Sequence, residues 1–169
     1  MYGRQEDSLA HGELNCSVSQ ARMYMKRFFE KYKDYTAWLN SQFQHAKQYG
    51  YVTNAFGFKR HWPLITRENE YKVKNQSWNT PVQGTASMIC MQALTRLQKK
   101  LVDEGYGRVL FTVHDSIVCN VKKEVLKDAC DLIYSEMTKQ ILPTPVPLEA
   151  ELEIGMSYKK VKGLDRKDG

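Results

Sequence analysis

The most restrictive pattern in the sequence is a pair of β-rich runs that two polar residues separate. The runs GRVLFTV (107–113) and SIVCNV (116–121) are rich in the branched and aromatic residues that favour strands. His114 and Asp115 stand between them, and a two-residue connection is the commonest link between antiparallel strands. We therefore predict a tight antiparallel hairpin with His114 and Asp115 at its tip.

Helical patterns dominate the rest of the chain. Apolar residues recur at helical spacing in three segments, so we expect helices over 17–49, 79–102 and 123–140, and a further, more polar helix over 65–78. The first helix should begin at a Ser17 or Ser19 cap, bend near Asp34 and end at Gly50. Asn79 and Pro81 are typical of a first helical turn, so the helix over 79–102 should start there.

Two further short segments alternate in the manner of strands. Residues 51–63 alternate around a turn at 54–57 and predict a second hairpin, and LEAELEI (148–154) predicts a last strand. The expected fold class is α/β, more narrowly α+β. Long helices should pack on a small antiparallel sheet that includes the hairpin tipped by His114 and Asp115.

Composition limits the class of protein. The chain has 169 residues, of which 42% are hydrophobic, and this suits one globular domain with a core. It has neither a long apolar run nor an apolar N-terminus, so we expect an intracellular, cytoplasmic protein with no membrane partner. The four cysteines are scattered without a Cys-x-x-Cys pair, and we expect them to be reduced.

Positive charge gathers in the middle of the chain. The net charge is +6, and residues 51–100 hold eight Lys and Arg against two Asp and Glu. Trp62, Tyr71 and Trp78 lie among these cations. Interleaved basic and aromatic residues are typical of a surface that binds polyanions, although a solvated helix surface has the same composition. The basic residues are Lys59, Arg60, Arg67, Lys72, Lys74, Arg96, Lys99 and Lys100.

Asp115 is a candidate metal ligand. A carboxylate at a hairpin tip stands clear of both strands, so a divalent cation with bound phosphates can reach it. The alternative is that Asp115 is an ordinary turn residue, since Asp is common in turns. His114 either orients the hairpin or a phosphate, or is a hydrogen-bonding turn residue.

Asn79 and Gln83 form a second candidate site. They are four residues apart, so on one helix they share a face, and their amides could donate to base-edge acceptors in the DNA minor groove. Gly84 leaves room there for the close approach of a backbone. The alternative is that Asn79 is a helix cap and Gln83 a surface residue.

Four motifs, in order along the chain, resemble the family A DNA polymerases, the group that includes bacterial DNA polymerase I. WNTPVQGTAS contains Asn79 and Gln83, and TVHDSIV contains Asp115. QYGYVTNAFGFKR resembles a conserved hairpin of that family, and VPLEAELEIGMSY resembles its closing strand. Tyr2 and Gly3 resemble the end of the family's nucleotide-binding fingers helix. The resemblance covers the whole chain.

The resemblance implies a role for each of these positions. Asp115 would be the metal ligand and His114 its catalytic neighbour, in a site with two Mg²⁺ ions shared with carboxylates that are not in this chain. Asn79 and Gln83 would contact the minor groove, and Tyr2 and Gly3 would lie near the nucleotide and template. Duplex phosphates would be contacted by Lys59 and Arg60, with Lys72 and Lys74 as substitutes for a family arginine that is Asn75 here. Ser116 stands where the family has Glu.

The family pattern further implies that this chain is the C-terminal part of a polymerase. Residues 1–169 would form a single partial unit, with distal fingers helices and a basic hairpin over about 1–78 and the second half of the palm over about 79–169. We expect it to combine with an N-terminal polypeptide that carries the other catalytic aspartate, to be inactive alone, and to expose an apolar face. Its substrates would be primer–template DNA and dNTPs. A virus or mobile element could carry such a split polymerase.

Two alternatives remain open from the sequence. One is a DNA-binding remnant without catalysis, which Ser116 favours. The other is a small metal-dependent nuclease that combines Asp115 with Glu149, Glu151 and Glu153. Those glutamates alternate along a strand with a wet face, which favours the interpretation that they are solvated.

Overall fold

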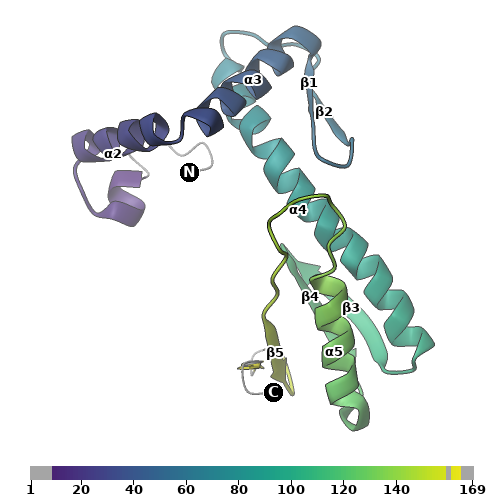
Figure 1. Ribbon diagram of the computed structural model, residues 1–169. Helices are drawn as coiled ribbons and strands as arrows, with labels where there is room; N and C mark the ends of the chain where they lie inside the picture. The colour runs from purple at the N-terminus through teal and green to yellow at the C-terminus, as the bar shows by residue number, and fades with distance from the viewer. Residues whose placement is uncertain (1–8, 159–160, 165–169) are drawn as a thin grey trace. The chain divides into compact units, whose positions relative to one another are not determined.

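The computed structural model of the chain describes residues 9–158 and 161–164 (Figure 1). The chain divides into two compact units, Met1–Thr85 and Ala86–Gly169. The assignment of about 1–78 to distal fingers and about 79–169 to the second half of the palm stays a prediction. In the part of the chain that the structure describes, no helix is long and apolar enough to cross a membrane.

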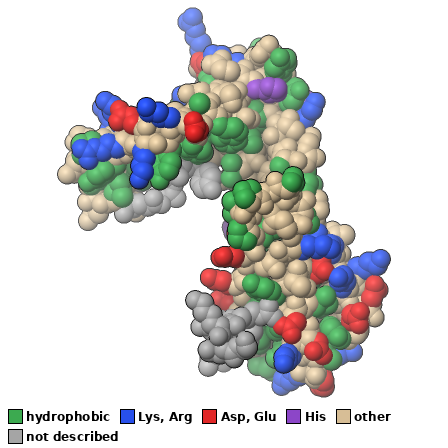
Figure 2. Space-filling view, viewed as in Figure 1, with side chains coloured by type: hydrophobic (Ala, Val, Ile, Leu, Met, Phe, Trp, Pro, Cys, Tyr) green, Lys and Arg blue, Asp and Glu red, His purple; other side chains and the backbone are tan. Residues whose placement is uncertain are grey.

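The first unit begins with a short π-helix, Ala10–Leu14, followed by α2 (Val18–Lys31) and α3 (Lys33–Tyr49). Ser17 caps α2 as predicted, because its side chain accepts a hydrogen bond from the Gln20 amide and Gln20 bonds back to the Ser17 amide. The predicted bend lies at Tyr32, whose ψ of 65° interrupts the helix. Figure 2 shows Lys and Arg side chains among hydrophobic ones over α2.

The hairpin after α3 is confirmed. Gly50, with a φ of 74°, ends the helix in the left-handed conformation that glycine adopts most readily. Strands β1 (Tyr51–Thr53) and β2 (Lys59–His61) then pair in antiparallel fashion. Asn54 organises the loop between them, since its Oδ1 accepts hydrogen bonds from the amides of Phe56 and Phe58. A small core beneath the hairpin consists of Phe43, Ala46, Val52 and Val73, with Trp62 and Ile65 packed against it.

The helix that follows corrects two predictions. Instead of separate helices over 65–78 and 79–102, one helix, α4, runs from Glu70 to Asp103 with Pro81 inside it. Asn79 is therefore not a helix cap. Pro81 lacks an amide hydrogen, so α4 loses one backbone bond there. Burial of apolar residues on both sides outweighs this loss: Val73 precedes the proline, and Leu97 follows it among the most buried side chains.

The predicted hairpin with His114 and Asp115 at its tip is confirmed, including the pairing of its strands. Strands β3 (Gly107–Val113) and β4 (Ser116–Val121) are antiparallel, and Val113 pairs with Ser116, so the turn consists of His114 and Asp115 alone. His114 takes a φ of 56°, as the first residue of such a turn requires. A register shift between Val109 and Phe111 forms a bulge. A 3-10 turn, Lys123–Val125, then leads into α5 (Leu126–Met137).

The last strand is shorter than predicted. Strand β5 covers Leu152–Gly155 rather than 148–154, and it pairs with β6 (Val161–Leu164), which the sequence patterns did not indicate. A strand extends only as far as it has a partner, and β6 has four residues. The fold class is confirmed as mixed helices and small antiparallel sheets. In residues 9–158 and 161–164, the strands form three two-stranded sheets rather than one.

Candidate nucleic-acid interface and metal ligand

An open pocket in the first unit brings together three of the residues that the sequence singled out. Asn79 and Gln83 lie one turn apart on α4, and Arg60 reaches the same pocket from β2. The pocket has a volume of about 340 Å³. Its lining residues are Arg60, Gln76, Asn79, Thr80, Gln83 and Gly84.

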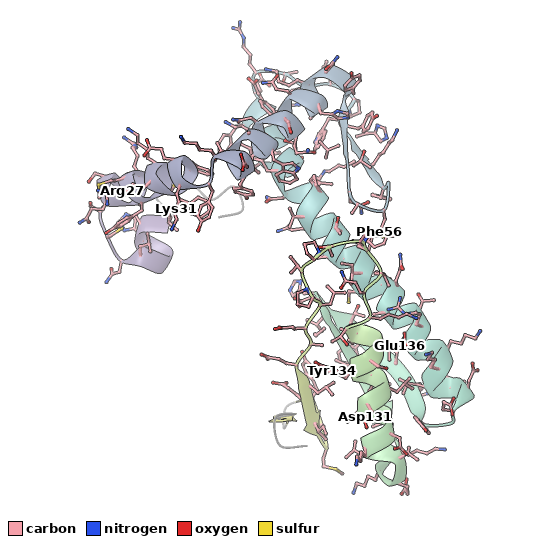
Figure 3. All side chains as sticks on the ribbon, in the orientation of Figure 1. Arg27, Lys31, Phe56, Asp131, Tyr134 and Glu136 are labelled. Carbon is pink, nitrogen blue, oxygen red and sulfur yellow. The ribbon has the colours of Figure 1, made fainter. Side chains whose placement is uncertain are left out.

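The loop of the β1–β2 hairpin is fastened to α4 beside this pocket. Asn54 Nδ2 donates to the Gly84 carbonyl at 3.1 Å, and the Ala55 amide donates to Thr85 Oγ1 at 3.1 Å. A Cβ added at Gly84 would lie 3.6 Å from Asn54 Cβ. Gly84 therefore makes an ordinary contact with the Asn54 side chain of the hairpin loop, in which Figure 3 labels Phe56, and the close approach of a backbone at Gly84 stays a prediction.

Arg60 and Gln76 are held in place by their neighbours. The Arg60 guanidinium donates to Thr80 Oγ1 at 3.5 Å and lies 5.8 Å from the centre of the Trp62 ring. Trp62 Nε1 donates to Gln76 Oε1 at 2.9 Å. This bond leaves the Gln76 amide hydrogens free to point elsewhere. The sequence patterns did not single out Gln76 and Thr80, although a helical spacing of three or four residues from Asn79 or Gln83 could have indicated them.

The other predicted DNA-binding cations lie outside the pocket. Lys59 Nζ sits 4.2 Å from the centre of the Tyr51 ring, and Lys74 Nζ sits 5.0 Å from that of Trp78. Lys72 is exposed on α4. The structure therefore gathers Arg60, Asn79 and Gln83 and leaves the three lysines at separate places.

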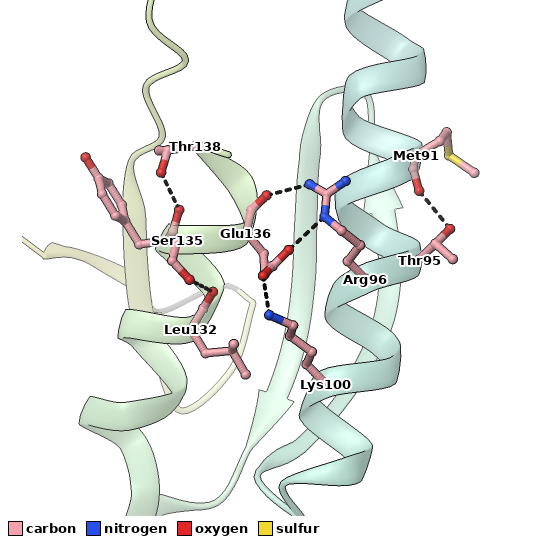
Figure 4. A network of polar contacts seen from close by, with 9 residues as sticks. Met91, Thr95, Arg96, Lys100, Leu132, Ser135, Glu136 and Thr138 are labelled. Atoms are coloured by element: carbon pink, nitrogen blue, oxygen red, sulfur yellow. Dashed lines mark hydrogen bonds and ion pairs between the residues drawn. The ribbon is translucent and has the colours of Figure 1, made fainter. Parts of the chain in front are cut away.

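Arg96 and Lys100, two of the clustered cations, are bound to a buried carboxylate. Glu136 on α5 points toward α4 and is almost completely buried, at 4% exposure (Figure 3). Arg96 Nε donates to its carboxylate at 2.7 Å, and Lys100 Nζ donates at 2.6 Å (Figure 4). Arg96 also donates to the Glu136 carbonyl at 2.9 Å. The single negative charge of Glu136 offsets one of these two positive charges, so the pair contributes less free positive charge to a polyanion-binding surface than the sequence suggests.

The pKa of Glu136 reflects this network. Burial alone would raise the pKa of the carboxyl, because a low dielectric disfavours the charged form. The hydrogen bonds and charges of Lys100 and Arg96 outweigh burial and bring the pKa below its ordinary value. Glu136 is therefore ionised in the folded protein at neutral pH.

Asp115 is exposed at the tip of the β3–β4 hairpin, and its backbone is fixed from two sides. Ser116 Oγ donates to the Val113 carbonyl at 2.8 Å across the turn. Cys90 Sγ, buried on α4, donates to the Asp115 carbonyl at 3.5 Å. Burial, and then the Asp115 charge, raise the pKa of the Cys90 thiol, so the sulfur keeps the proton that it donates. His114 is exposed beside Asp115.

The donor set at the tip suits part of a magnesium site. Magnesium prefers oxygen ligands, and a carboxylate free of the strand ladder can provide one or two. Among the described residues, no group of three His, Cys, Asp or Glu side chains is placed to hold a metal ion. No such group therefore joins Asp115 with Glu149, Glu151 and Glu153, the set that the nuclease alternative combines.

Two further predictions concern the cysteines and the N-terminus. None of the four cysteines, all of which lie in the described part of the chain, forms a disulfide, and burial raises the pKa of Cys119 to about 11. Tyr2 and Gly3 lie outside the described residues, so their predicted place near the nucleotide and template stays a prediction.

Comparison with known proteins places these features in a family. The family model of DNA polymerase family A matches residues 1–160. DNA polymerase I of Bacillus caldotenax is 31% identical over 167 residues, and that of Thermus aquaticus is 30% identical over 165. A DNA polymerase of Bacillus phage SP01 is 28% identical over 169 residues.

A solved structure shows the same likeness. The POL domain of Pol1 from M. smegmatis, in complex with DNA primer-template and dNTP, has a TM-score of 0.75 and 26% identity; the match covers 88% of this chain and 26% of that one. The match to the Bacillus caldotenax enzyme covers 96% of this chain but 19% of the relative, and for Thermus aquaticus the shares are 96% and 20%. The chain thus spans about a fifth of the length of these curated relatives. The chain belongs to the family A DNA polymerases.

Proposed function

We propose that this chain forms part of a DNA-directed DNA polymerase, which adds dNTPs to a primer 3′-hydroxyl by nucleotidyl transfer with two Mg²⁺ ions. The observation that carries this proposal is the two-residue turn that presents Asp115, in a chain of the polymerase family. The paired strands and the Cys90 bond hold the tip. A metal ligand needs such a rigid support.

The chemistry needs more than one carboxylate. When bound, two divalent ions would supply a lower pKa for the attacking hydroxyl and stabilisation of the leaving pyrophosphate, and acidic side chains would hold them. Asp115 supplies one of these ligands in our proposal, with His114 next to it. The remaining carboxylates come from an N-terminal polymerase polypeptide, including the other catalytic aspartate.

Exposed apolar residues on β3 support the proposal that a partner polypeptide binds there. Leu110, Phe111 and Val113 are 46%, 45% and 39% exposed, although all three belong to residue types that are usually buried. Neighbouring exposed apolar residues mark surfaces that another polypeptide covers. They lie on the strand that leads to the His114–Asp115 turn, so a partner seated there would bring its carboxylates toward Asp115.

The pocket of the first unit suits the minor groove of a primer–template duplex. The amides of Asn79 and Gln83 can donate to the N3 and O2 acceptors that every base pair presents there, which tests pair shape without reading sequence. Arg60 adds a positive charge for the phosphate backbone. Lys59, Lys72 and Lys74 contribute further phosphate contacts, and Tyr2 and Gly3 lie near the nucleotide.

A primer-extension assay tests this proposal. A labelled primer–template, the four dNTPs and Mg²⁺ are incubated with the chain alone and with the N-terminal polypeptide. We expect the primer to be extended only when both polypeptides are present. Asp115→Asn should abolish this extension, and Asp103→Asn should retain it, because it makes the same change at an exposed residue near the end of α4. Extension by Asp115→Asn at the wild-type rate would refute the role of Asp115.

The second candidate function is a DNA-binding remnant without catalysis. Ser116 favours it, because the family carries a glutamate there and the Ser116 hydroxyl is bonded within the turn. In that case the primer is extended neither by the chain alone nor by the two polypeptides together, while salt-sensitive DNA binding remains. Asp115→Asn would then leave binding unchanged or tighten it, since a carboxylate repels phosphate when no metal lies between them.

A further inference from the structure

The β1–β2 hairpin has two faces with different surroundings. Neighbouring residues of a strand point to opposite faces, and cross-strand partners share a face. Val52 pairs with Arg60; Val52 is fully buried and Arg60 lines the pocket against α4. The opposite face therefore carries Tyr51, its partner His61, and Lys59.

Rings on this opposite face contact one another and continue onto the end of α3. The ring centres of Tyr51 and His61 are 5.4 Å apart, and His45 of α3 lies 5.1 Å from Tyr51 and 4.6 Å from Tyr49. Lys59 Nζ lies 4.2 Å from the Tyr51 ring centre. We call this set the outer aromatic face; it consists of His45, Tyr49, Tyr51, Lys59 and His61.

The outer aromatic face is open and positively charged. Tyr49 is 56% exposed, and Lys59 and His61 are also exposed. Residues 45–62 contain no acidic residue, and Lys59 supplies the positive charge of this face, because Arg60 lies on the other face and Lys47 pairs with Glu70 at 2.8 Å. Exposed rings held in fixed positions next to a cation are the combination that binds single-stranded nucleic acid, because each base stacks on a ring and each phosphate needs a positive partner.

We propose that the outer aromatic face binds single-stranded nucleic acid, with a base stacked on Tyr49 and a phosphate at Lys59. This surface is separate from the pocket of Asn79 and Gln83, because the hairpin turns Arg60 to one side and Lys59 to the other. Stacking is tolerant of sequence, so the surface takes any unpaired segment. The proposal does not depend on catalysis at Asp115.

The first test uses the full chain and a fluorescein-labelled oligothymidylate of about 12 nucleotides, a length within the usual range of single-strand sites. Binding is followed by fluorescence anisotropy. We expect Tyr49→Ala to weaken binding by about fivefold or more, and Tyr49→Phe to bind as the wild type does, because phenylalanine keeps the stacking ring. Equal affinity of Tyr49→Ala and the wild type would overturn the proposal.

The second test measures affinity against salt concentration. Each phosphate contact to a single strand adds about 0.7 to the slope of log affinity against log salt, so Lys59→Met should lower the slope by about that amount. An unchanged slope would overturn the phosphate contact at Lys59. If far-UV circular dichroism shows that Tyr49→Ala is unfolded, the salt slope of Lys59→Met alone tests whether the outer aromatic face binds the single strand.

Gln83→Ala separates this proposal from the proposed polymerase function. It changes an exposed pocket residue on α4, away from the outer aromatic face. We expect it to weaken binding of a primer–template duplex and to leave oligothymidylate binding unchanged. If Gln83→Ala weakens oligothymidylate binding as much as Tyr49→Ala does, the single strand occupies the pocket instead, and the proposal for the outer face is wrong.

Discussion

The buried carboxylate of Glu136 offers the sharpest test of what holds the second unit together. Glu136→Gln keeps the shape of the side chain but removes its charge. The Arg96 bond to the Glu136 carbonyl survives, whereas the bonds from Arg96 Nε and Lys100 Nζ lose their ionic partner. The substitution therefore tests two charge-assisted hydrogen bonds of 2.7 and 2.6 Å.

The expected loss follows from burial. A hydrogen bond to a charged group contributes about 1.5–3 kcal/mol. The Glu136 side chain is 5% exposed and that of Arg96 24%, whereas the Lys100 side chain is 50% exposed, so the bond from Lys100 is partly screened by solvent. We expect Glu136→Gln to lower the free energy of unfolding by about 3 kcal/mol. That corresponds to a fall of about 6–12 °C in Tm for a chain of this size.

Acid should remove the same contribution from the wild type. The folded pKa of Glu136 lies below its ordinary value, so the unfolded chain binds the proton more readily than the folded one. The stabilisation is complete above the unfolded pKa of about 4.3 and is lost as pH falls through the folded pKa. Glu136→Gln has no carboxyl to titrate, so the difference between the two proteins should shrink across that range.

Urea unfolding followed by far-UV circular dichroism measures both effects. Glu124→Gln is the matched control, because Glu124 is exposed in the 3-10 turn before α5, and surface changes of this kind alter stability by about 0.5 kcal/mol at most. If Glu136→Gln at neutral pH is no less stable than Glu124→Gln, the network does not stabilise the unit and the reasoning is refuted.

Further predictions concern the glycines, the hairpin loop and the pocket. Gly84→Ala should raise the free energy of unfolding by about 0.5–1 kcal/mol, because alanine favours a helix interior and the added Cβ meets Asn54 at 3.6 Å, an ordinary contact. Gly107→Ala should destabilise by several kcal/mol, since its Cβ would clash with the Asn120 carbonyl oxygen. Equal stability of Gly84→Ala and Gly107→Ala in urea would contradict both glycine predictions. Asn54→Ala, which frees two loop amides, should cost about 2–3 kcal/mol in the same assay. Arg60→Met should lower the salt slope of duplex binding by about 1, and an unchanged slope would exclude a phosphate contact at Arg60.

Local patterns were enough to predict the two hairpins. The His114–Asp115 turn follows from the length and composition of the two runs that flank it, and Gly50 marks the end of α3 by its conformational freedom. Both signals act over a few residues of sequence. The Asn79–Pro81 signal is equally local but gave the wrong result, because the packing of Val73 and Leu97 maintains α4 through a proline.

Interactions between distant parts of the chain were not predictable from one sequence. From the sequence, Arg96 and Lys100 are counted as unpaired cations. Their partner Glu136 lies 40 and 36 positions away, and no residue near Glu136 in sequence indicates this pairing. The pairing of β5 with β6 is short, and the sequence of β6 lacks the alternation of apolar and polar residues that would predict a strand. The bond from Cys90 to the Asp115 carbonyl joins residues 25 apart. The turn that carries Asp115 could be predicted from local sequence, but the contacts that fix it could not.

The β1–β2 hairpin explains why the two proposed binding surfaces can be tested separately. Strand alternation places Lys59 and Arg60, which are adjacent in sequence, on opposite faces. Arg60 is directed toward Thr80 and the amides of α4, which suits a duplex groove, whereas Lys59 is directed toward Tyr51 among exposed rings, which suits unpaired bases. A one-residue slip of β2 would exchange these roles. The pairs Tyr51–His61 and Thr53–Lys59 therefore fix the register on which both proposals depend.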